Sequence, residues 1–296
     1  MFRQFLSRLH RYEIRIRKAV NNPRQGNFHS VFKGSGLDFS DLRQYQYGDD
    51  IRAIDWNSSA KGHGTYIKLF REEKEQTVFF LLDVSGSQQV GTSQRQKVDT
   101  AREICGVLTL AAVKEASQVG LQCFSDQNER YIRPGGGMKQ AYRIISAIYN
   151  LEPVSKKTNL SRTILHALEM LNRRSLIFLI SDFVDSGYEL HLKAMARKHD
   201  VIVINLYDKS EQEVPAMGII PVLNAETGER SWVNTSSPFY RNTVGEQFLE
   251  RKRNLERICR QNKADYLSIE SSEDFVPLLI RLFRVRRYQK ERSASK

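Results

Sequence analysis

The sequence has few of the features that mark disulfide-rich, zinc-thiolate or membrane-spanning proteins. Its three cysteines, Cys105, Cys123 and Cys259, lie far apart and form no Cys-x-x-Cys pair. This set indicates neither a disulfide framework nor a cysteine zinc site, so we expect buried, reduced thiols. No apolar run reaches the roughly 18 residues that a membrane span requires, and the N-terminus lacks the apolar core of a signal peptide. We therefore predict a cytoplasmic protein, which can still lie peripherally at the inner membrane.

The motifs of several enzyme classes are also missing. There is no Gly-x-Ser-x-Gly nucleophile elbow, and the glycines at 135–137 are not followed by the Gly-Lys-Ser/Thr of a phosphate loop. A haloacid-dehalogenase-like phosphatase needs a second Asp two residues after the first. The residue two positions after Asp83 is Ser85, which cannot protonate a leaving group near neutral pH. We predict that the protein is not an enzyme, and a metal-dependent hydrolase is the remote alternative.

The positive charge of the chain is confined to its two ends. Residues 1–25 and 281–296 each hold seven Lys or Arg and one Glu, so each carries +6 and together they account for the formal +12. Residues 26–280 are formally neutral, which argues against a broad phosphate-binding surface. Residues 1–20 predict an amphipathic helix that packs on the main domain or docks to an acidic partner or membrane surface. An alternative function is therefore binding of nucleic acid or an anionic membrane surface through the basic termini.

Apolar runs alternate with helical patterns through the middle of the chain. The runs that begin at Val78, Ser175 and Val201 are typical of strands buried on both faces, and helical periodicity separates them. This order predicts an α/β fold with a doubly wound, mostly parallel sheet and helices on both faces. Residues 120–124 and 130–133 predict two short strands that form a hairpin at the sheet edge.

Three consecutive segments follow from these patterns. We expect an N-terminal helix and a mostly irregular or β region over residues 1–75, packed on the main domain. The α/β domain spans 76–287 and carries a hairpin insertion at about 208–236, and a basic tail covers 288–296.

Two of the predicted strands end in carboxylates that one edge of the sheet would bring together. Asp83 is followed at alternate positions by Ser85 and Ser87, and Asp182 closes the second strand. Thr158, at a helix start between the two strands, can reach the same edge, although Thr158 or Asn159 can also simply serve as the N-cap of that helix. Such hard oxygen donors suit Mg²⁺ or Mn²⁺ rather than zinc. The sequence therefore predicts a metal site formed by Asp83, Ser85, Ser87, Thr158 and Asp182.

Aromatic residues alternate with glycines and charges before the first strand of the predicted sheet. Three acids in this stretch, Asp49, Asp50 and Asp55, are possible metal ligands. We favour the interpretation that they cap turns and pair with nearby arginines, which would fix an ordered, mostly non-helical layer.

Two sets of motifs resemble known families. The order Asp-x-Ser-x-Ser, Thr-Asn-Leu and Ser-Asp over residues 83–182 resembles the von Willebrand factor A domain with its metal-ion-dependent adhesion site. Residues 32–56 contain Gly-Ser-Gly-Leu-Asp-Phe, Leu-Arg-Gln-Tyr, Gly-Asp-Asp-Ile-Arg and Ile-Asp-Trp. They resemble the signature of a bacterial family called domain of unknown function 58, and this likeness covers nearly the whole chain.

The resemblance implies both a ligand set and a partner. It implies ion contacts from Ser85, Ser87 and Thr158, with Asp83 and Asp182 contacting the ion directly or through water. Members of the family are often encoded beside MoxR-type AAA+ ATPases, which implies such an ATPase and a client protein as partners in assembly or maturation. The function we expect is a non-enzymatic protein-binding module whose metal ion holds an acidic residue of the partner. We expect no specific nucleic acid.

Overall fold

The chain divides into two compact units. The computed structural model describes residues 2–20, 38–61, 64–71, 76–92, 95–223, 225 and 227–294. The larger unit comprises residues 1–32 and 77–296, and the smaller one comprises residues 33–76. This division differs from the expected first region of residues 1–75, because the N-terminal helix belongs with the sheet.

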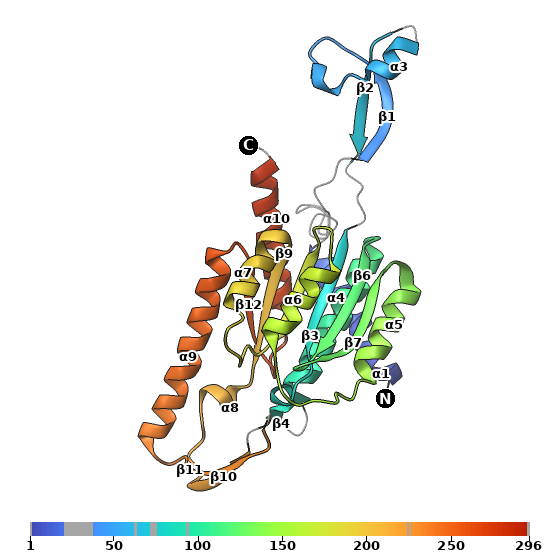
Figure 1. The fold of residues 1–296 in the computed structure, drawn as a ribbon. Helices are drawn as coiled ribbons and strands as arrows, with labels where there is room; N and C mark the ends of the chain where they lie inside the picture. Colours follow the sequence, from blue (N-terminus) through green and yellow to red (C-terminus); the bar gives the residue numbers. More distant parts are fainter. Residues whose placement is uncertain are drawn as a thin grey trace. The chain divides into compact units, whose positions relative to one another are not determined.

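A six-stranded sheet forms the centre of the larger unit (Figure 1). Its order is β12-β9-β8-β3-β6-β7, and all neighbours are parallel except β6 and β7, which pair as an antiparallel hairpin at the edge. The strands are β3 (Thr77–Asp83), β6 (Gln118–Phe124), β7 (Asn128–Gly135), β8 (Leu176–Ser181), β9 (Asp200–Tyr207) and β12 (Asp265–Glu270). The predicted fold class and the edge hairpin are confirmed.

Alternate residues of the central strands point to opposite faces and build two cores. Phe80 stacks on Phe178 at 5.2 Å between ring centroids in one core, whereas Phe79 and Leu81 lie in the other. The first core is covered by α1 (Phe2–Val20), α4 (Lys97–Lys114), α5 (Gly137–Tyr149) and α10 (Val276–Ala294). The second is covered by α6 (Leu160–Met170), α7 (Glu189–Lys198) and α9 (Pro238–Gln261). Both faces of the sheet are therefore buried, as the continuous apolar strands require.

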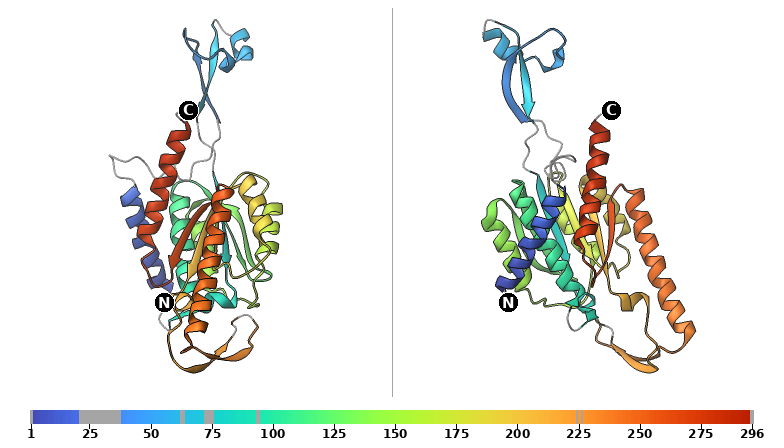
Figure 2. Two further views of the ribbon diagram at one scale, coloured as in Figure 1. Left: turned by 90° about the vertical axis from the view of Figure 1, so that its left-hand side faces the viewer. Right: turned by 180° about the vertical axis from the view of Figure 1, so that it is seen from behind.

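Helix α1 lies against α4 and α10 (Figure 2). A Cβ atom at Gly106 would lie 2.6 Å from Leu9 Cδ1, so this glycine allows the two helices to approach closely. Buried Glu13 pairs with Lys114 at 2.6 Å, and Arg8 pairs with Glu103 at 2.7 Å. The predicted amphipathic helix is confirmed, and its apolar face packs on the domain.

An insertion follows β9. It contains one turn of helix, α8 (Lys209–Gln212), and an antiparallel hairpin of β10 (Ile219–Leu223) and β11 (Arg230–Asn234). Ser237 then caps α9 by accepting a hydrogen bond from the backbone N–H of Tyr240 at 3.4 Å. The expected hairpin at 208–236 is present.

Helix α10 continues past residue 287, where we expected the α/β domain to end and the basic tail to begin. It reaches Ala294, because the Lys, Arg, Gln and Glu residues beyond 287 favour helix and no Gly or Pro interrupts them. The last two residues of the expected basic tail lie outside the described part of the chain.

The smaller unit is built on an antiparallel ribbon with short helical turns. It contains β1 (Asp38–Gln44), η1 (Ile51–Ala53), α3 (Trp56–Lys61) and β2 (Tyr66–Arg71). Arg43 forms two hydrogen bonds to Asp49, at 2.9 and 2.7 Å, and Asp50 caps η1 by accepting the N–H of Arg52. Asp55 accepts a hydrogen bond from Ser58 Oγ at 3.1 Å. These acids hold turns, as we favoured; residues 29–37 lie outside the described part.

The cysteines are buried as free thiols, as expected, and burial raises the pKa of Cys123 to about 12. None of the described helices is both long and apolar enough to cross a bilayer.

Candidate metal centre at the carboxyl edge of the sheet

The loop after β3 gathers three oxygen-bearing side chains; we call residues 83–87 the serine loop. Asp83 Oδ1 accepts hydrogen bonds from Ser85 N at 2.9 Å and from Ser85 Oγ at 2.6 Å. Ser85 Oγ lies 3.1 Å from Ser87 Oγ. All three side chains are buried. The alternate spacing of these residues therefore turns three oxygen-bearing side chains toward one another.

The second carboxylate oxygen of Asp83 is bound by the neighbouring strand. Because β8 pairs with β3, Ser181 lies beside Asp83 and donates its hydroxyl to Asp83 Oδ2 at 2.5 Å. Burial raises the pKa of Asp83, and the nearby charge of Asp182 raises it further. Hydrogen bonds from Ser181 and Ser85 oppose this, and the resulting pKa is about 7. A divalent cation would have to compete with a proton for this carboxylate below that pH.

Asp182, which directly follows β8, has a charged partner. Lys97 Nζ lies 2.7 Å from Asp182 Oδ2 and 2.6 Å from Glu211 Oε1. The side chain of Lys97 is fully buried, that of Asp182 is 2% exposed and that of Glu211 is 23% exposed. Burial disfavours the charged amine, but the two carboxylates more than offset it, so the pKa of Lys97 is raised. We call these three residues the Lys97 cluster.

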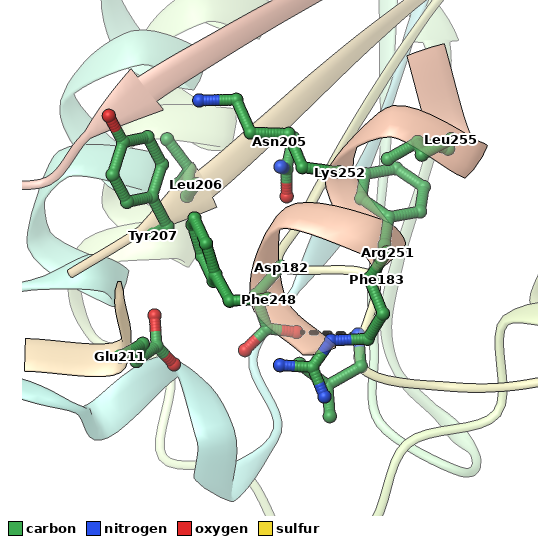
Figure 3. Close-up of a pocket in the computed structure, with 11 residues that line it drawn as sticks. Asp182, Phe183, Asn205, Leu206, Tyr207, Glu211, Phe248, Arg251, Lys252 and Leu255 are labelled. Atoms are coloured by element: carbon green, nitrogen blue, oxygen red, sulfur yellow. Dashed lines mark hydrogen bonds between the residues drawn. The ribbon is translucent and has the colours of Figure 1, made fainter. Parts of the chain in front are cut away.

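A pocket adjoins the Lys97 cluster (Figure 3). Asp182 and Glu211 line it on one side, and α9 contributes Phe248, Arg251 and other residues. Lys252, also in the lining, lies over the ring of Tyr207 at 4.6 Å from the centroid. The pocket therefore combines acidic, basic and aromatic groups beside one of the predicted metal ligands.

Thr158 lies in the loop that leads into α6. Asn159, the next residue, caps that helix by accepting the N–H of Arg162 at 2.8 Å. Two residues before Thr158, the carbonyl of Lys156 accepts the N–H of Gly86 at 2.8 Å. The predicted cap function therefore belongs to Asn159, and the Thr158 loop contacts the serine loop.

The insertion closes on the same edge. A Cβ atom at Gly86 would lie 2.4 Å from the carbonyl oxygen of Ala225, in the turn between β10 and β11. The same Cβ would lie 3.1 Å from Lys156 Cβ. Figure 1 shows the hairpin and β4 (Gly91–Thr92) at one end of the sheet. Glycine at position 86 thus lets the hairpin turn and the Thr158 loop meet the serine loop.

The donor chemistry of the serine loop fits Mg²⁺ or Mn²⁺. A carboxylate and two hydroxyls are hard oxygen ligands, and Mg²⁺ commonly keeps several waters beside one or two protein carboxylates. Among the described residues, no three His, Cys, Asp or Glu side chains come together as a metal cluster. Asp182 is the exception to the fit, because an ammonium group already compensates its charge. Asp83, Ser85 and Ser87 are therefore the residues best arranged to hold an ion.

Three residues of this edge were not among the predicted ligands. Ser181 could have been recognised, because it shares the Ser-Asp ending of the second apolar strand. Lys97 and Glu211 carry no comparable signal, since they come from a polar helix start and a one-turn helix whose contact arises only in the folded chain.

A family model described as "Protein of unknown function DUF58" matches residues 41–254. The chain belongs to the DUF58 family. The uncharacterised protein Rv1480 of Mycobacterium tuberculosis is 22% identical over 278 residues, which cover 93% of this DUF58 chain and 87% of the relative. An uncharacterised protein of Mycobacterium avium is 24% identical over 136 residues, which cover 46% of this chain and 80% of the relative.

Solved structures similar to this DUF58 chain include BatB from Bacteroides thetaiotaomicron. It has 13% identity and a TM-score of 0.47, and the match covers 72% of this chain and 99% of BatB. The VWA domain of SpRpn10 has 14% identity and a TM-score of 0.40, with 70% and 94% covered. Manganese-loaded TRAP protein of Plasmodium vivax has 18% identity and a TM-score of 0.35, with 44% and 57% covered.

Proposed function

We propose that this DUF58 protein is a non-enzymatic binding module that holds an acidic residue of a partner protein through Mg²⁺ or Mn²⁺. The predicted ligands are Asp83, Ser85, Ser87, Thr158 and Asp182. The observation that carries the proposal is the serine loop, where two hydroxyls lie within hydrogen-bonding distance of each other and one of them bonds Asp83. The resemblance of residues 83–182 to the von Willebrand factor A domain with its metal-ion-dependent adhesion site supports the same interpretation.

The chain prepares the site in two ways. Buried strand ends fix Asp83 and Ser181, so the donors are oriented before a ligand arrives. Gly86 also packs against the Ala225 and Lys156 segments, and these contacts fix the position of the serine loop. A bound ion would supply a positive charge with an open coordination position for a carboxylate of the partner.

We further propose a MoxR-type AAA+ ATPase as the partner, together with a client protein in assembly or maturation. This proposal rests on the family resemblance. The captured acidic residue would lie on the surface of the ATPase or the client. The residues that flank it on the partner would then contact the pocket of Figure 3, which adjoins the site.

The test is capture of a purified MoxR-type ATPase by the immobilised full-length protein, in Mg²⁺ and in chelator. Asp83→Asn keeps the shape of the side chain but removes its charge, so we expect both chelator and this variant to abolish capture. Asp274→Asn is the matched control, because Asp274 is half-exposed and pairs with Arg15 at the α1–α10 contact. Capture that survives both chelator and Asp83→Asn would contradict the adhesion mechanism.

A second candidate function is binding to an anionic membrane surface through the basic helices. The observation that favours it is the packing of α1 beside α10, where Arg284 donates to the carbonyl of Ala19 at 3.0 Å. Arg3, Arg11 and Lys18 are exposed on α1. Sedimentation with phosphatidylserine vesicles should then fall steeply with salt and be insensitive to chelator. Salt-independent or absent binding would exclude this candidate, and binding to DNA instead would favour the nucleic-acid alternative.

A further inference from the structure

We propose that Lys97 is a built-in competitor of the divalent cation: its ammonium group neutralises Asp182 and thereby weakens ion binding at the serine loop. The inference rests on the proposed function, because it assigns the control of ion affinity at the same site. Nothing in the ligand pattern of the sequence includes a lysine.

Lys97 is held in place by its own helix start. It is the first residue of α4, its backbone N–H donates to the carbonyl of Val90 at 3.0 Å, and Gln96 and Asp99 form a capping box around it. Its side chain is fully buried and reaches two carboxylates within 2.7 Å. A buried ammonium group is stable only when such partners compensate its charge, so the contact is a fixed part of the fold.

The charges explain why this arrangement opposes an ion. Asp182 and Glu211 carry two negative charges and Lys97 carries one positive charge, so the cluster has a formal charge of −1. An ion that shared Asp182 would lie near the ammonium group and be repelled by it. At separations of a few ångströms, one unit charge changes affinity by about tenfold or more.

Glu211 makes the competition reversible. Its Oε1 accepts from Lys97 at 2.6 Å, while its Oε2 accepts the backbone N–H of Asp208 at 2.8 Å and so fixes the side chain. When Asp182 turns to an ion, Glu211 can keep the ammonium group compensated. Ion binding would therefore exchange one partner of Lys97 and leave no buried charge alone.

The experiment measures Mn²⁺ binding at about pH 8 by the electron paramagnetic resonance signal of free Mn²⁺. Lys97→Met keeps the length of the side chain without its charge, and we expect it to bind at least about tenfold more tightly than the natural protein. The double variant Lys97→Met/Glu211→Gln keeps the cluster charge at −1 while it frees Asp182, so it should also bind more tightly. Lys114→Met is the control, since Lys114 lies on the same helix but pairs with Glu13.

The outcomes separate this inference from the proposed function. Equal or weaker Mn²⁺ binding by folded Lys97→Met and by the double variant overturns the competition, because Lys97 would then position Asp182 for the ion. No Mn²⁺ binding by any folded variant overturns the metal site and the inference together. If Lys97→Met does not fold, the charge-matched double variant decides. Adding Asp83→Asn to either variant should abolish the tighter binding, which places it at the serine loop.

Discussion

Asp83 and Asp182 end neighbouring strands of one sheet, yet their carboxylates are stabilised by opposite means. Asp83 accepts hydrogen bonds from the neutral groups of Ser85 and Ser181, whereas Asp182 is bound by the ammonium group of Lys97. Hydroxyls can themselves bind a cation, but an ammonium group competes with one. The comparison teaches that position at the sheet edge does not by itself make a carboxylate an available ligand.

The same difference determines how favourable each charged carboxylate is when no ion is bound. The serine loop keeps a carboxylate whose pKa is raised to about 7 by burial and by Asp182, so its charge is unfavourable in the absence of an ion. The Lys97 cluster contains its own counter-charge and is stable as it stands. A bound ion would thus compensate the charge of Asp83, but it would compete with the ion pair between Lys97 and Asp182.

The largest effect on stability should come from removing the ammonium group. In chelator, Lys97→Met leaves Asp182 and Glu211 without their counter-charge, and breaking a buried ion pair in this way costs about 3–5 kcal/mol. Asp83→Asn at about pH 8 should cost little or even stabilise, because it removes a buried charge while the amide oxygen can still accept the Ser85 N–H and the two serine hydroxyls can reorient. Urea unfolding in chelator measures both. Equal losses in the two variants would show that the two carboxylates are not stabilised differently.

The pH dependence gives a smaller and more specific effect. The folded-state pKa of Asp83, about 7, lies above the ordinary value of 3.8, so between these values the folded protein binds a proton that the unfolded chain does not. The contribution of this group therefore falls as pH rises from about 4 to about 7 and is constant above. We expect the stability of the natural protein, relative to Asp83→Asn, to increase as pH is lowered through this window.

Urea unfolding in chelator at several pH values tests this. His199 also titrates on acidification, because burial lowers its pKa to about 4, but it is present in both proteins and cancels in the difference. If the difference in unfolding free energy between the two proteins stays constant from about pH 8 to about pH 5, the pKa of Asp83 is not raised in the folded protein.

Sequence reasoning predicted the half of the site that is local in the chain. Asp83, Ser85 and Ser87 are separated by one residue each, and a buried strand before them fixes where they point. Asp182 was placed at this sheet edge for the same reason, since an apolar strand precedes it. The parallel sheet then followed from the order of strands and helices, because short connections leave few other arrangements.

The rest of the site depends on contacts between distant segments. Lys97 and Asp182 are 85 residues apart, and Lys97 and Glu211 are 114 apart. A lysine at a helix start is usually exposed, so its full burial has no sequence signal. The packing of α1 with the sheet unit was among the expected alternatives, but periodicity alone could not choose between the domain and an external partner.

The most direct test of the central claim is the number of Mn²⁺ ions that the full-length protein binds, with Asp83→Asn and Asp274→Asn in parallel. Loss of even an indirect metal contact commonly weakens binding by about 10–100-fold, so loss of the Asp83 charge should weaken it by at least about 100-fold. The account predicts one ion per chain in the natural protein and in Asp274→Asn, and none at the same concentration in Asp83→Asn. Equal Mn²⁺ binding by all three proteins would contradict it.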